Sequence, residues 1–280
     1  MTRQAYYKNG KNQFTEQVSN DLIITMVKKV REKQKRIGAR KLIEIISKQL
    51  PEEMLIGRDA FFNLLRHYGL LVRRRKTRAI TTNSFHWLHK YPNLIRDLDP
   101  IRPNQLWVSD ITYIKAGERF VYLFLITDAY SKKIIGYRLA KNLDSIHAVN
   151  SLQDAIKNTC QPISGLIHHS DRGIQYCSKE YTDLLNKHAI SISMTENGDP
   201  LENPVAERIN GILKDEYLND KINNHSDLNP KHLSYAIEKY NTSRPHLSCE
   251  MLTPEEAHKG HGKLQRMWKN YYRKRVNLEV

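Results

Sequence analysis

The chain has 280 residues, of which 45 are Lys or Arg and 30 are Asp or Glu, giving a formal net charge of +15. A hydrophobic fraction of 40% is consistent with a folded core. The mean hydropathy of −0.63 and the lack of a long apolar run argue against a membrane span, and the N-terminus lacks the apolar segment of a secretory signal. The three cysteines are widely spaced and odd in number, so they fit neither a disulfide framework nor a zinc site, and we expect a protein of the reducing cytoplasm.

The positive charge is concentrated in the first third of the chain. Residues 1–99 contain 21 Lys and Arg against 9 Asp and Glu, a net charge of +12, whereas residues 100–280 are close to neutral at +3. A basic segment joined to a nearly neutral one indicates a nucleic-acid-binding module attached to something else. The plainer alternative is a highly charged soluble surface. We predict a basic helical DNA-binding domain over residues 1–90.

Two helical segments are predicted within this basic part. Apolar residues recur at helical spacing over residues 18–50, and Pro51 ends that pattern. A second helix follows near Arg58, with Gly69 placed to end it. This outline is that of a helix-turn-helix DNA-binding module, although three-helix cores without a DNA role share it. On that interpretation the candidate DNA contacts are Arg58, Asn63, Arg66 and His67.

A run of like charge follows the second predicted helix directly. It consists of Arg73, Arg74, Arg75, Lys76 and Arg78. Such runs are usually solvated linkers, but this one adjoins a candidate DNA-binding helix, so we predict that it contacts DNA phosphates. Each such contact would add roughly 0.9 to the slope of log K against log salt.

The pattern changes after a linker over residues 91–104, which three prolines mark. Strands are predicted over residues 105–114, 120–127, 133–139, 165–169 and 190–194, and helices over residues 144–158, 178–187 and 204–220. This order is that of the ribonuclease H-like fold, an analogy that does not by itself fix function. We predict an α/β catalytic core over residues 105–258, a five-stranded mixed sheet flanked by helices. The all-α helix-turn-helix-type domain precedes it, and a basic tail over residues 259–280 follows.

Three acidic residues on different kinds of element form the candidate catalytic set. Asp110 interrupts the apolar face of the first predicted strand at its centre, where a lone carboxylate is costly to desolvate. Asp171 lies just past the fourth predicted strand, a common location for active sites in α/β sheets. Glu207 lies near the start of a predicted helix. Three acids that converge suggest divalent metal ions and phosphate chemistry, because carboxylates are hard oxygen ligands suited to Mg²⁺ or Mn²⁺.

Each acid also has a purely structural interpretation. Asp110 is equally consistent with a pairing to an arginine or to backbone amides, and Asp171 with an Asx-turn. A capping box is a weak explanation for Glu207, because with Asn203 as the N-cap the acid falls one residue too late. Lys214, seven residues after Glu207, shares its helical face, so the two can hold a metal and a DNA phosphate together or form a solvated stripe.

Three further residues near these acids are alternatives that we weigh less. Glu202 is a rival third acid, but it falls in the loop before the predicted helix. His168 and His169 invite a zinc interpretation, which we discount because no Cys or His partner lies at zinc-ligand spacing. No set of side chains typical of a protein nucleophile is visible, and two-metal chemistry requires none.

The residues around the acids resemble the three catalytic blocks of DDE transposases. The blocks are Trp107-x-x-Asp110-Ile111-Thr112, His169-Ser170-Asp171-Arg172-Gly173-x-Gln175-Tyr176 and Glu207-Arg208-x-Asn210-Gly211-x-Leu213-Lys214-x-Glu216. They are most similar to those of bacterial insertion sequences of the IS3 family, in the OrfB-type reading frame. The family's C-terminal signature is resembled by Tyr240-Asn241-x-x-Arg244-Pro245-His246 and by Thr253-Pro254-Glu255-Glu256-Ala257. Pro204, where many relatives carry Ala, is a departure that suits a first helical turn.

The resemblance implies a catalytic core of the retroviral-integrase type. In that core Asp110, Asp171 and Glu207 would hold two Mg²⁺ ions, for which Mn²⁺ can substitute. It implies copy-out–paste-in transposition, in which one strand is nicked at an element end and the freed 3′-hydroxyl attacks near the other end. The resulting circle is later integrated into target DNA. The implied partners are double-stranded DNA (element ends and target), further copies of the chain on DNA, and an upstream-frame, OrfA-type partner or fusion; the implied location is the bacterial cytoplasm, at the nucleoid.

Two other functions fit parts of the pattern. A nuclease of the same fold would hydrolyse DNA without joining it, and the C-terminal signature argues against it. A DNA-binding regulator with an inactive core would bind DNA without metal dependence, which an intact set of three acids makes the weaker hypothesis. We therefore predict a DDE-type transposase, a metal-dependent polynucleotidyl transferase.

Overall fold

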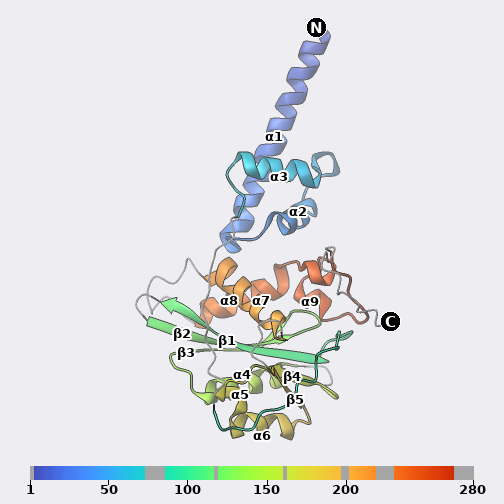
Figure 1. Cartoon of the computed structure of the whole chain (residues 1–280). Helices are drawn as coiled ribbons and strands as arrows, with labels where there is room; N and C mark the ends of the chain where they lie inside the picture. Colours follow the sequence, from blue (N-terminus) through green and yellow to red (C-terminus); the bar gives the residue numbers. More distant parts are fainter. Residues whose placement is uncertain are drawn as a thin grey trace, which may run out of the picture.

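The computed structural model describes residues 3–72, 86–116, 119–159, 163–196, 202–218 and 230–267, with the backbone alone for residues 3–16, 115, 116 and 119. An N-terminal helical part stands beside a core built around one sheet (Figure 1). Within these described ranges, no helix combines the length and apolar character that a membrane crossing requires.

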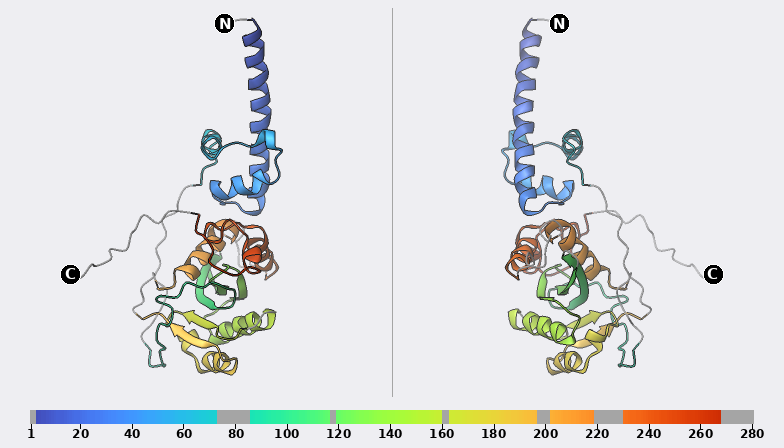
Figure 2. Two further views of the ribbon diagram at one scale, coloured as in Figure 1. Left: turned by 90° about the vertical axis from the view of Figure 1, so that its right-hand side faces the viewer. Right: turned by 90° about the vertical axis from the view of Figure 1, so that its left-hand side faces the viewer.

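The N-terminal part consists of four helical segments. They are α1 (Arg3–Lys33), α2 (Ala39–Ser47), a 3₁₀ turn (Glu52–Met54) and α3 (Arg58–His67). Their shared core contains Ile23, Ile24, Val27, Ile37, Leu42, Ile46, Phe61 and Leu65. Gly69 ends α3 as predicted: its φ of 64° is left-handed, and the Leu70 amide donates back to the Leu65 carbonyl at 2.7 Å. Figure 2 shows α1 extending well beyond the other helices.

The prediction of one helix over residues 18–50 is wrong, because the chain reverses direction between α1 and α2. Gly38 is extended and begins α2, and the side chain of Ile37 in the turn is fully buried. The reversal folds the apolar stripe of α2 back onto that of α1. One continuous helix would leave both stripes without a partner, so burial of apolar surface outweighs helical continuity here.

The core is the five-stranded mixed sheet that the sequence predicts. Its strands are β1 (Leu106–Ala116), β2 (Arg119–Asp128), β3 (Ile134–Ala140), β4 (Ile167–Ser170) and β5 (Ser191–Met194). The strand order is β3-β2-β1-β4-β5. The three N-terminal strands pair antiparallel, and β4 and β5 join parallel to β1 and to each other. Strand β1 is therefore central, and its C-terminal half lies at the edge where active sites of α/β sheets form.

Helices cover both faces of this sheet (Figure 1). One face carries α7 (Pro204–Ile212), which continues as a π-helix (Leu213–Leu218), together with α8 (Pro230–Ser243), a 3₁₀ turn (Leu247–Cys249) and α9 (Pro254–Ala257). The other carries α4 (Ser145–Asn158), α5 (Ile174–Cys177) and α6 (Lys179–Lys187). The helices predicted over residues 144–158 and 178–187 are confirmed as α4 and α6. The helix predicted over residues 204–220 is α-helical to Ile212 and π-helical from Leu213 to Leu218, and α5, α8 and α9 are additions to the prediction.

Alternation along β1 decides which side chains meet which helices. Trp107 is fully buried on the side of α4 and α6, among Leu152 and Tyr181. Ile114 packs on the opposite side, against Ile209 of α7. Even-numbered residues of β1 therefore face α7, and Asp110 is one of them.

Residues 86–104 follow the surface of the core. Leu88 and Tyr91 pack against its apolar interior, and the Met194 amide at the end of β5 donates to the Pro92 carbonyl at 3.2 Å. The Leu94 amide donates to the Ser193 hydroxyl at 2.9 Å. The predicted linker thus covers the outer edge of β5. The boundaries of the predicted domains remain predictions.

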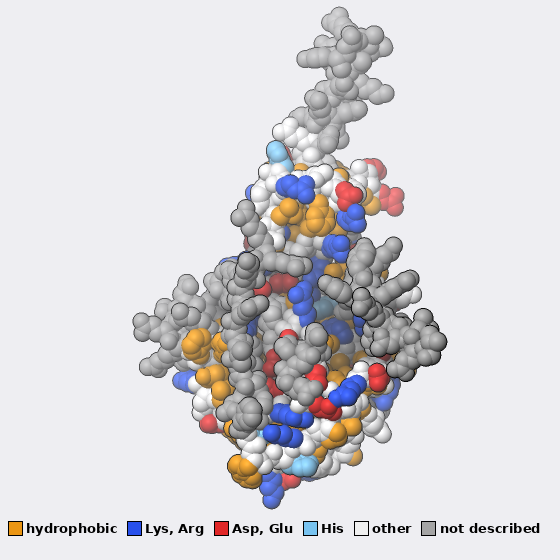
Figure 3. Space-filling view, viewed as in Figure 1, with side chains coloured by type: hydrophobic (Ala, Val, Ile, Leu, Met, Phe, Trp, Pro, Cys, Tyr) orange, Lys and Arg blue, Asp and Glu red, His pale blue; other side chains and the backbone are white. Residues whose placement is uncertain are grey.

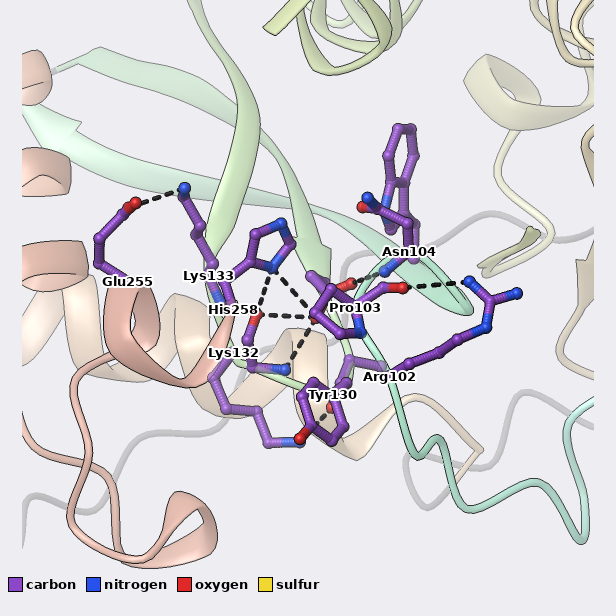
Figure 4. A network of polar contacts seen from close by, with 12 residues as sticks. Arg102, Pro103, Asn104, Tyr130, Lys132, Lys133, Glu255 and His258 are labelled. Atoms are coloured by element: carbon purple, nitrogen blue, oxygen red, sulfur yellow. Dashed lines mark hydrogen bonds and ion pairs between the residues drawn. The ribbon is translucent and has the colours of Figure 1, made fainter. Parts of the chain in front are cut away.

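A buried carboxylate ties this segment to the sheet and to the C-terminal helix (Figure 4). Asp128, at the end of β2 and without exposure to solvent, accepts hydrogen bonds from the Asn104 amide and from the amide and hydroxyl of Ser131 at 2.7–2.8 Å. His258 Nδ1, just after α9, lies 2.9 Å from the Ser131 hydroxyl. Although a serine, a histidine and an aspartate meet here, the hydroxyl donates to the aspartate, so the network joins chain segments and presents no activated nucleophile.

The N-terminal part contacts the core through α2. Lys41 Nζ lies 3.9 Å from Glu216 Oε1 of the π-helix, and both side chains are mostly buried. Burial, together with the charges of Arg244 and Arg208, lowers the pKa of Lys41 to about 7 despite the attraction of Glu216. Hydrogen bonds with Thr253 lower the pKa of Glu256 in α9, and the charge of Lys48, the C-cap residue of α2, adds a smaller effect in the same direction. Basic side chains of α2 therefore face acidic side chains of the core.

The depressed pKa of Lys41 makes stability depend on pH. Between about pH 7 and pH 10 the unfolded chain keeps a proton on Lys41 that the folded chain has lost, so stability rises with pH in that window. Lys41→Met removes the group, and we expect this variant to have a larger free energy of unfolding than the wild type at pH 7. The difference between the two free energies is expected to be about 2 kcal/mol smaller at pH 9. Urea unfolding at both pH values measures this. Lys48→Met, at an exposed position, is the control, and a gap that does not change with pH would contradict the assignment.

Candidate active site

Asp110 lies in the middle of β1, partly buried beneath α7. Asn210 Nδ2 of α7 donates a hydrogen bond to Asp110 Oδ2 at 2.6 Å, and the Ile111 amide donates to Oδ1 at 2.9 Å. The predicted structural alternative, pairing with backbone amides, thus describes one of its two oxygens. The other is held by the helix that carries Glu207.

The pKa of Asp110 reflects its burial and the charges of the other two predicted acids. Burial raises it, the charge of Asp171 raises it further, and Glu207 adds a smaller effect in the same direction. The hydrogen bonds from Asn210 and Ile111 lower it, and the net result is a pKa of about 7. A carboxyl in this state is poised to exchange its proton for a cation.

Asp171 follows the last residue of β4, next to β1 in the sheet. Its Oδ1 accepts the Gly173 amide at 2.9 Å, which is the Asx-turn foreseen as an alternative. A Cβ at Gly173 would lie 3.0 Å from Asp171 Oδ1 and 3.2 Å from Gln175 Oε1. Glycine at this position therefore leaves room for the turn that directs Asp171. The turn and the electrostatic link to Asp110 coexist.

Glu207 lies on the exposed side of α7, one turn after the helix begins. Asn203 is the N-cap and Pro204 the first helical residue, and no side-chain capping bond forms. Asn203 Nδ2 instead donates to the Ser109 carbonyl at 2.9 Å. Because Asn203 and Asn210 are two helical turns apart, α7 is fixed to adjacent residues of β1 at both ends, and Glu207 lies between these two contacts.

Lys214 belongs to the π-helix that continues α7 and contacts a residue near the C-terminal end of β1. Its Nζ is 5.1 Å from the centre of the Tyr113 ring of β1, a cation–π distance. Burial lowers the pKa of Lys214, and the charge of Asp110 opposes that effect. The other three predicted catalytic residues, Asp171, Glu207 and Lys214, thus interact with Asp110 through their charges.

The metal prediction can be compared with the donors that are present. Within the described ranges, no three His, Cys, Asp or Glu side chains lie in a group that could hold a metal ion as they stand. The charges of Asp171 and Glu207 nevertheless act on Asp110, and this repulsion is what a divalent cation would relieve. The oxygen donors of the three acids suit Mg²⁺ or Mn²⁺, so the residues fit the ion by chemistry and charge, with side-chain movement needed to gather them.

The neighbouring histidines and Glu202 serve other contacts. His168 Nε2 lies 2.7 Å from the Ser109 hydroxyl and 2.9 Å from the Tyr181 hydroxyl, and burial lowers its pKa to about 3. His169 Nδ1 lies 2.8 Å from the Ser193 hydroxyl. Glu202 accepts the Glu196 amide at 2.6 Å.

The predicted DNA contacts divide into two groups. Arg58, Asn63 and Arg66 lie on the exposed face of α3, where Arg58 pairs with Asp59 and Arg66 donates to Asn63. Basic side chains are visible on this part of the molecule and on the front of the core (Figure 3). The run Arg73, Arg74, Arg75, Lys76 and Arg78 lies outside the described residues.

Two residues of the site were not singled out as ligands or contacts by the sequence. Asn203 and Asn210 attach α7 to β1, and their spacing of seven on one helical face is the signal that could have revealed them. Asn210 stands inside the third motif, three residues after Glu207.

Comparisons with known proteins agree with this geometry. Two family models described as an integrase core domain match residues 100–200 and residues 188–254. An insertion element IS600 protein of 31 kDa from Shigella sonnei is 32% identical over 203 residues, covering 72% of this chain and 74% of that protein. The chain belongs to the IS3 family of transposases. The Shigella sonnei transposase for insertion sequence element IS629 is 29% identical over 231 residues, covering 82% of this chain and 76% of that protein.

A solved structure adds the fold of the core. The simian T-cell lymphotropic virus intasome in complex with the PP2A regulatory subunit B56 gamma matches with a TM-score of 0.52 at 22% identity, covering 85% of this chain and 80% of that chain. This likeness confirms the predicted ribonuclease H-like fold. The family models and the transposase relatives confirm the family and the enzyme class, a DDE-type polynucleotidyl transferase. The catalytic roles of individual residues of this IS3-family transposase remain predictions.

The raised pKa of Asp110 gives a test that needs no DNA. Between about pH 4 and pH 7 the metal-free folded protein binds a proton at Asp110 that the unfolded chain has released, so stability from this group falls as pH rises through that window. In EDTA, Asp110→Asn is expected to have a larger free energy of unfolding than the wild type. The difference between the two is expected to grow by about 2 kcal/mol from pH 5 to pH 8. Thermal unfolding measures the gap. Asp154→Asn, on the other face of the sheet, is the control, and a gap independent of pH would show that Asp110 is not the titrating group.

Proposed function

We propose that this chain catalyses metal-dependent DNA strand cleavage and strand transfer in copy-out–paste-in transposition of an IS3-family element. The observation that supports this most directly is the electrostatic coupling of Asp110 to Asp171, Glu207 and Lys214. Three acids and a lysine on separate elements serve no common packing purpose. They suit a site that binds divalent cations and a phosphate.

In this proposal Asp110, Asp171 and Glu207 hold two Mg²⁺ ions, for which Mn²⁺ substitutes. When bound, such ions activate a water or a 3′-hydroxyl and stabilise the departing oxygen. Asn210 fixes the orientation of Asp110 through its 2.6 Å hydrogen bond. Lys214, held over Tyr113 beside Asp110, attracts the phosphate of the strand that reacts. No side chain forms a covalent intermediate.

The partners follow from the charge of the chain. The exposed face of α3, with Arg58, Asn63 and Arg66, binds the double-stranded element ends, and the basic run after it binds phosphates. Target DNA joins at the core. The likeness to a retroviral intasome supports an assembly of several copies on DNA, and an upstream-frame, OrfA-type partner or fusion supplies further contacts.

Strand transfer is the direct test of this function. The full chain is incubated with Mg²⁺ or Mn²⁺ and duplexes that carry the ends of the encoding element, and nicked and joined strands are separated on denaturing gels. Asp110→Asn, Asp171→Asn and Glu207→Gln are each expected to reduce joined product by about 1,000-fold or more, because each removes a metal-holding oxygen. Joined product at the wild-type level in any of these variants would contradict the proposal.

The matched control for Glu207 is Glu202→Gln. Glu202 is the neighbouring acid, and its carboxylate accepts a backbone amide, so its variant is expected to stay within about twofold of the wild type. If Glu202→Gln abolished joining and Glu207→Gln did not, Glu202 would be the third metal ligand in place of Glu207. Cleavage without joining would favour a nuclease, and metal-independent, sequence-specific binding without cleavage would favour a regulator.

DNA binding separates the two groups of basic residues. Arg58→Ala with Arg66→Ala is expected to lower affinity for element ends more than affinity for an unrelated duplex, because base contacts specify sequence. Neutralising Arg73, Arg74, Arg75, Lys76 and Arg78 is expected to weaken both equally and to reduce the salt slope by roughly 0.9 for each DNA phosphate that the variant no longer neutralises. Fluorescence anisotropy across a salt series measures both, with Arg138→Gln as the control. An unchanged slope would make the run a linker.

A further inference from the structure

The π-helix that follows α7 needs an explanation. It runs from Leu213 to Leu218 without a break after α7 and carries Lys214. π-helical turns are rare and are frequently found at functional sites. Contacts with the C-terminal motif, residues 240–246, hold this π-helix in place. The proposed chemistry gives that motif no role.

Glu216 and Arg244 form a bidentate ion pair between the π-helix and the end of α8. Arg244 Nε lies 2.7 Å from Glu216 Oε2, and Arg244 Nη2 lies 2.7 Å from Glu216 Oε1. The side chain of Arg244 is 1% exposed to solvent and that of Glu216 is 9% exposed. Two parallel hydrogen bonds fix the mutual orientation of the groups as well as their distance. Here that orientation is between the π-helix and α8.

The remaining arm of Arg244 is also held in place. Its Nη1 lies 3.0 Å from His246 Nε2, and burial and the charge of Arg244 lower the pKa of His246 well below its ordinary value. A neutral imidazole accepts this hydrogen bond. The guanidinium carbon lies 5.9 Å from the centre of the Tyr240 ring. Arg244 is therefore held in a single orientation from several sides.

Helix α8 is in turn fixed to the edge strand of the sheet. Asn241 accepts a hydrogen bond from the Ile134 amide at 3.0 Å and donates to the Ile134 carbonyl at 2.9 Å, as a neighbouring strand would. The Tyr240 hydroxyl donates to the Lys132 carbonyl at 2.8 Å. A continuous path of hydrogen bonds thus leads from the sheet through α8 and Arg244 to Glu216.

We propose that Glu216 and Arg244 are positioning residues that set the π-helix so that Lys214 faces Asp110. Lys214 and Glu216 are two residues apart, so they point to nearly opposite sides of the helix, one toward Tyr113 of β1 and the other toward Arg244. Holding Glu216 fixes the rotation that directs Lys214. A buried ion pair is weak evidence for added stability, and orientation is the role that its geometry supports. The kinetic part of the inference rests on the proposed function.

Hydrogen exchange tests whether the Glu216–Arg244 ion pair, here called the brace, holds the π-helix in the full chain without DNA. Glu216→Gln keeps the size of the side chain and removes its charge. Amide exchange over residues 210–218 is expected to rise by about tenfold or more, while exchange in β1 and β2 stays within about twofold of the wild type. Asp154→Asn, which breaks the Arg138–Asp154 ion pair on the other face, is the control and leaves residues 210–218 unchanged. Unchanged exchange in Glu216→Gln, or an equal rise across the whole core, would overturn the inference.

A double-mutant cycle with Lys214 separates positioning from a general structural role. Glu216→Gln is expected to lower kcat for strand cleavage on element-end duplexes by about tenfold with little change in KM. In a Lys214→Ala background the same substitution is expected to lower kcat by no more than about twofold, because its effect passes through Lys214. Equal losses in both backgrounds would overturn the inference.

Two further outcomes are decisive. If Glu216→Gln does not fold, the pair Glu216→Gln with Arg244→Met removes both buried charges and replaces it in both experiments. If the wild type cleaves no DNA, the proposed function fails, and the exchange pattern alone decides whether the brace exists.

Discussion

The structure depends on placing Asp110, a carboxylate, on the apolar face of a central strand. Its burial and the charges of Asp171 and Glu207 all oppose ionisation, so the surrounding elements must hold an arrangement that electrostatics disfavours in the absence of a cation. Helix α7 does this with two asparagines, which hydrogen-bond to Ser109 and to Asp110 itself. The helix is thus attached by neutral donors that tolerate either charge state of the acid. Within the part of the chain that the structure describes, no arginine pairs with Asp110.

Much of the core could be predicted from sequence because its pattern is local. Alternation in β1 put Asp110 on the correct face, and the cap position of Asn203 and the turn at Asp171 followed from residue type and spacing. The reversal at Gly38 could not be predicted in this way, because the apolar period is the same whether residues 18–50 form one helix or two. Only the packing of α2 back onto α1 decides between them, and that is a tertiary effect.

The contacts of the C-terminal motif could not be predicted from the sequence either. Asn241 contacts Ile134 from 107 positions away, and Arg244 contacts Glu216 from 28 positions away. The motif was recognisable as a resemblance, but its physical role needs the third dimension: it fixes α8 to the edge strand and the π-helix to α8. A long-range polar contact leaves no periodic signal, whereas an apolar stripe does.

Glu216 of this ion pair also connects the N-terminal helical part to the core. Glu216 holds Arg244 on one side and receives Lys41 of α2 on the other, so the helical part that carries the candidate DNA-binding face contacts the turn that carries Lys214. Because the lowered pKa of Lys41 reflects incomplete compensation of its buried charge, this contact is weaker than the ion pair beneath it. A rearrangement of α2 on DNA would therefore release Lys41 before it disturbed Arg244. The orientation of Lys214 would then be kept during a movement of the N-terminal helical part.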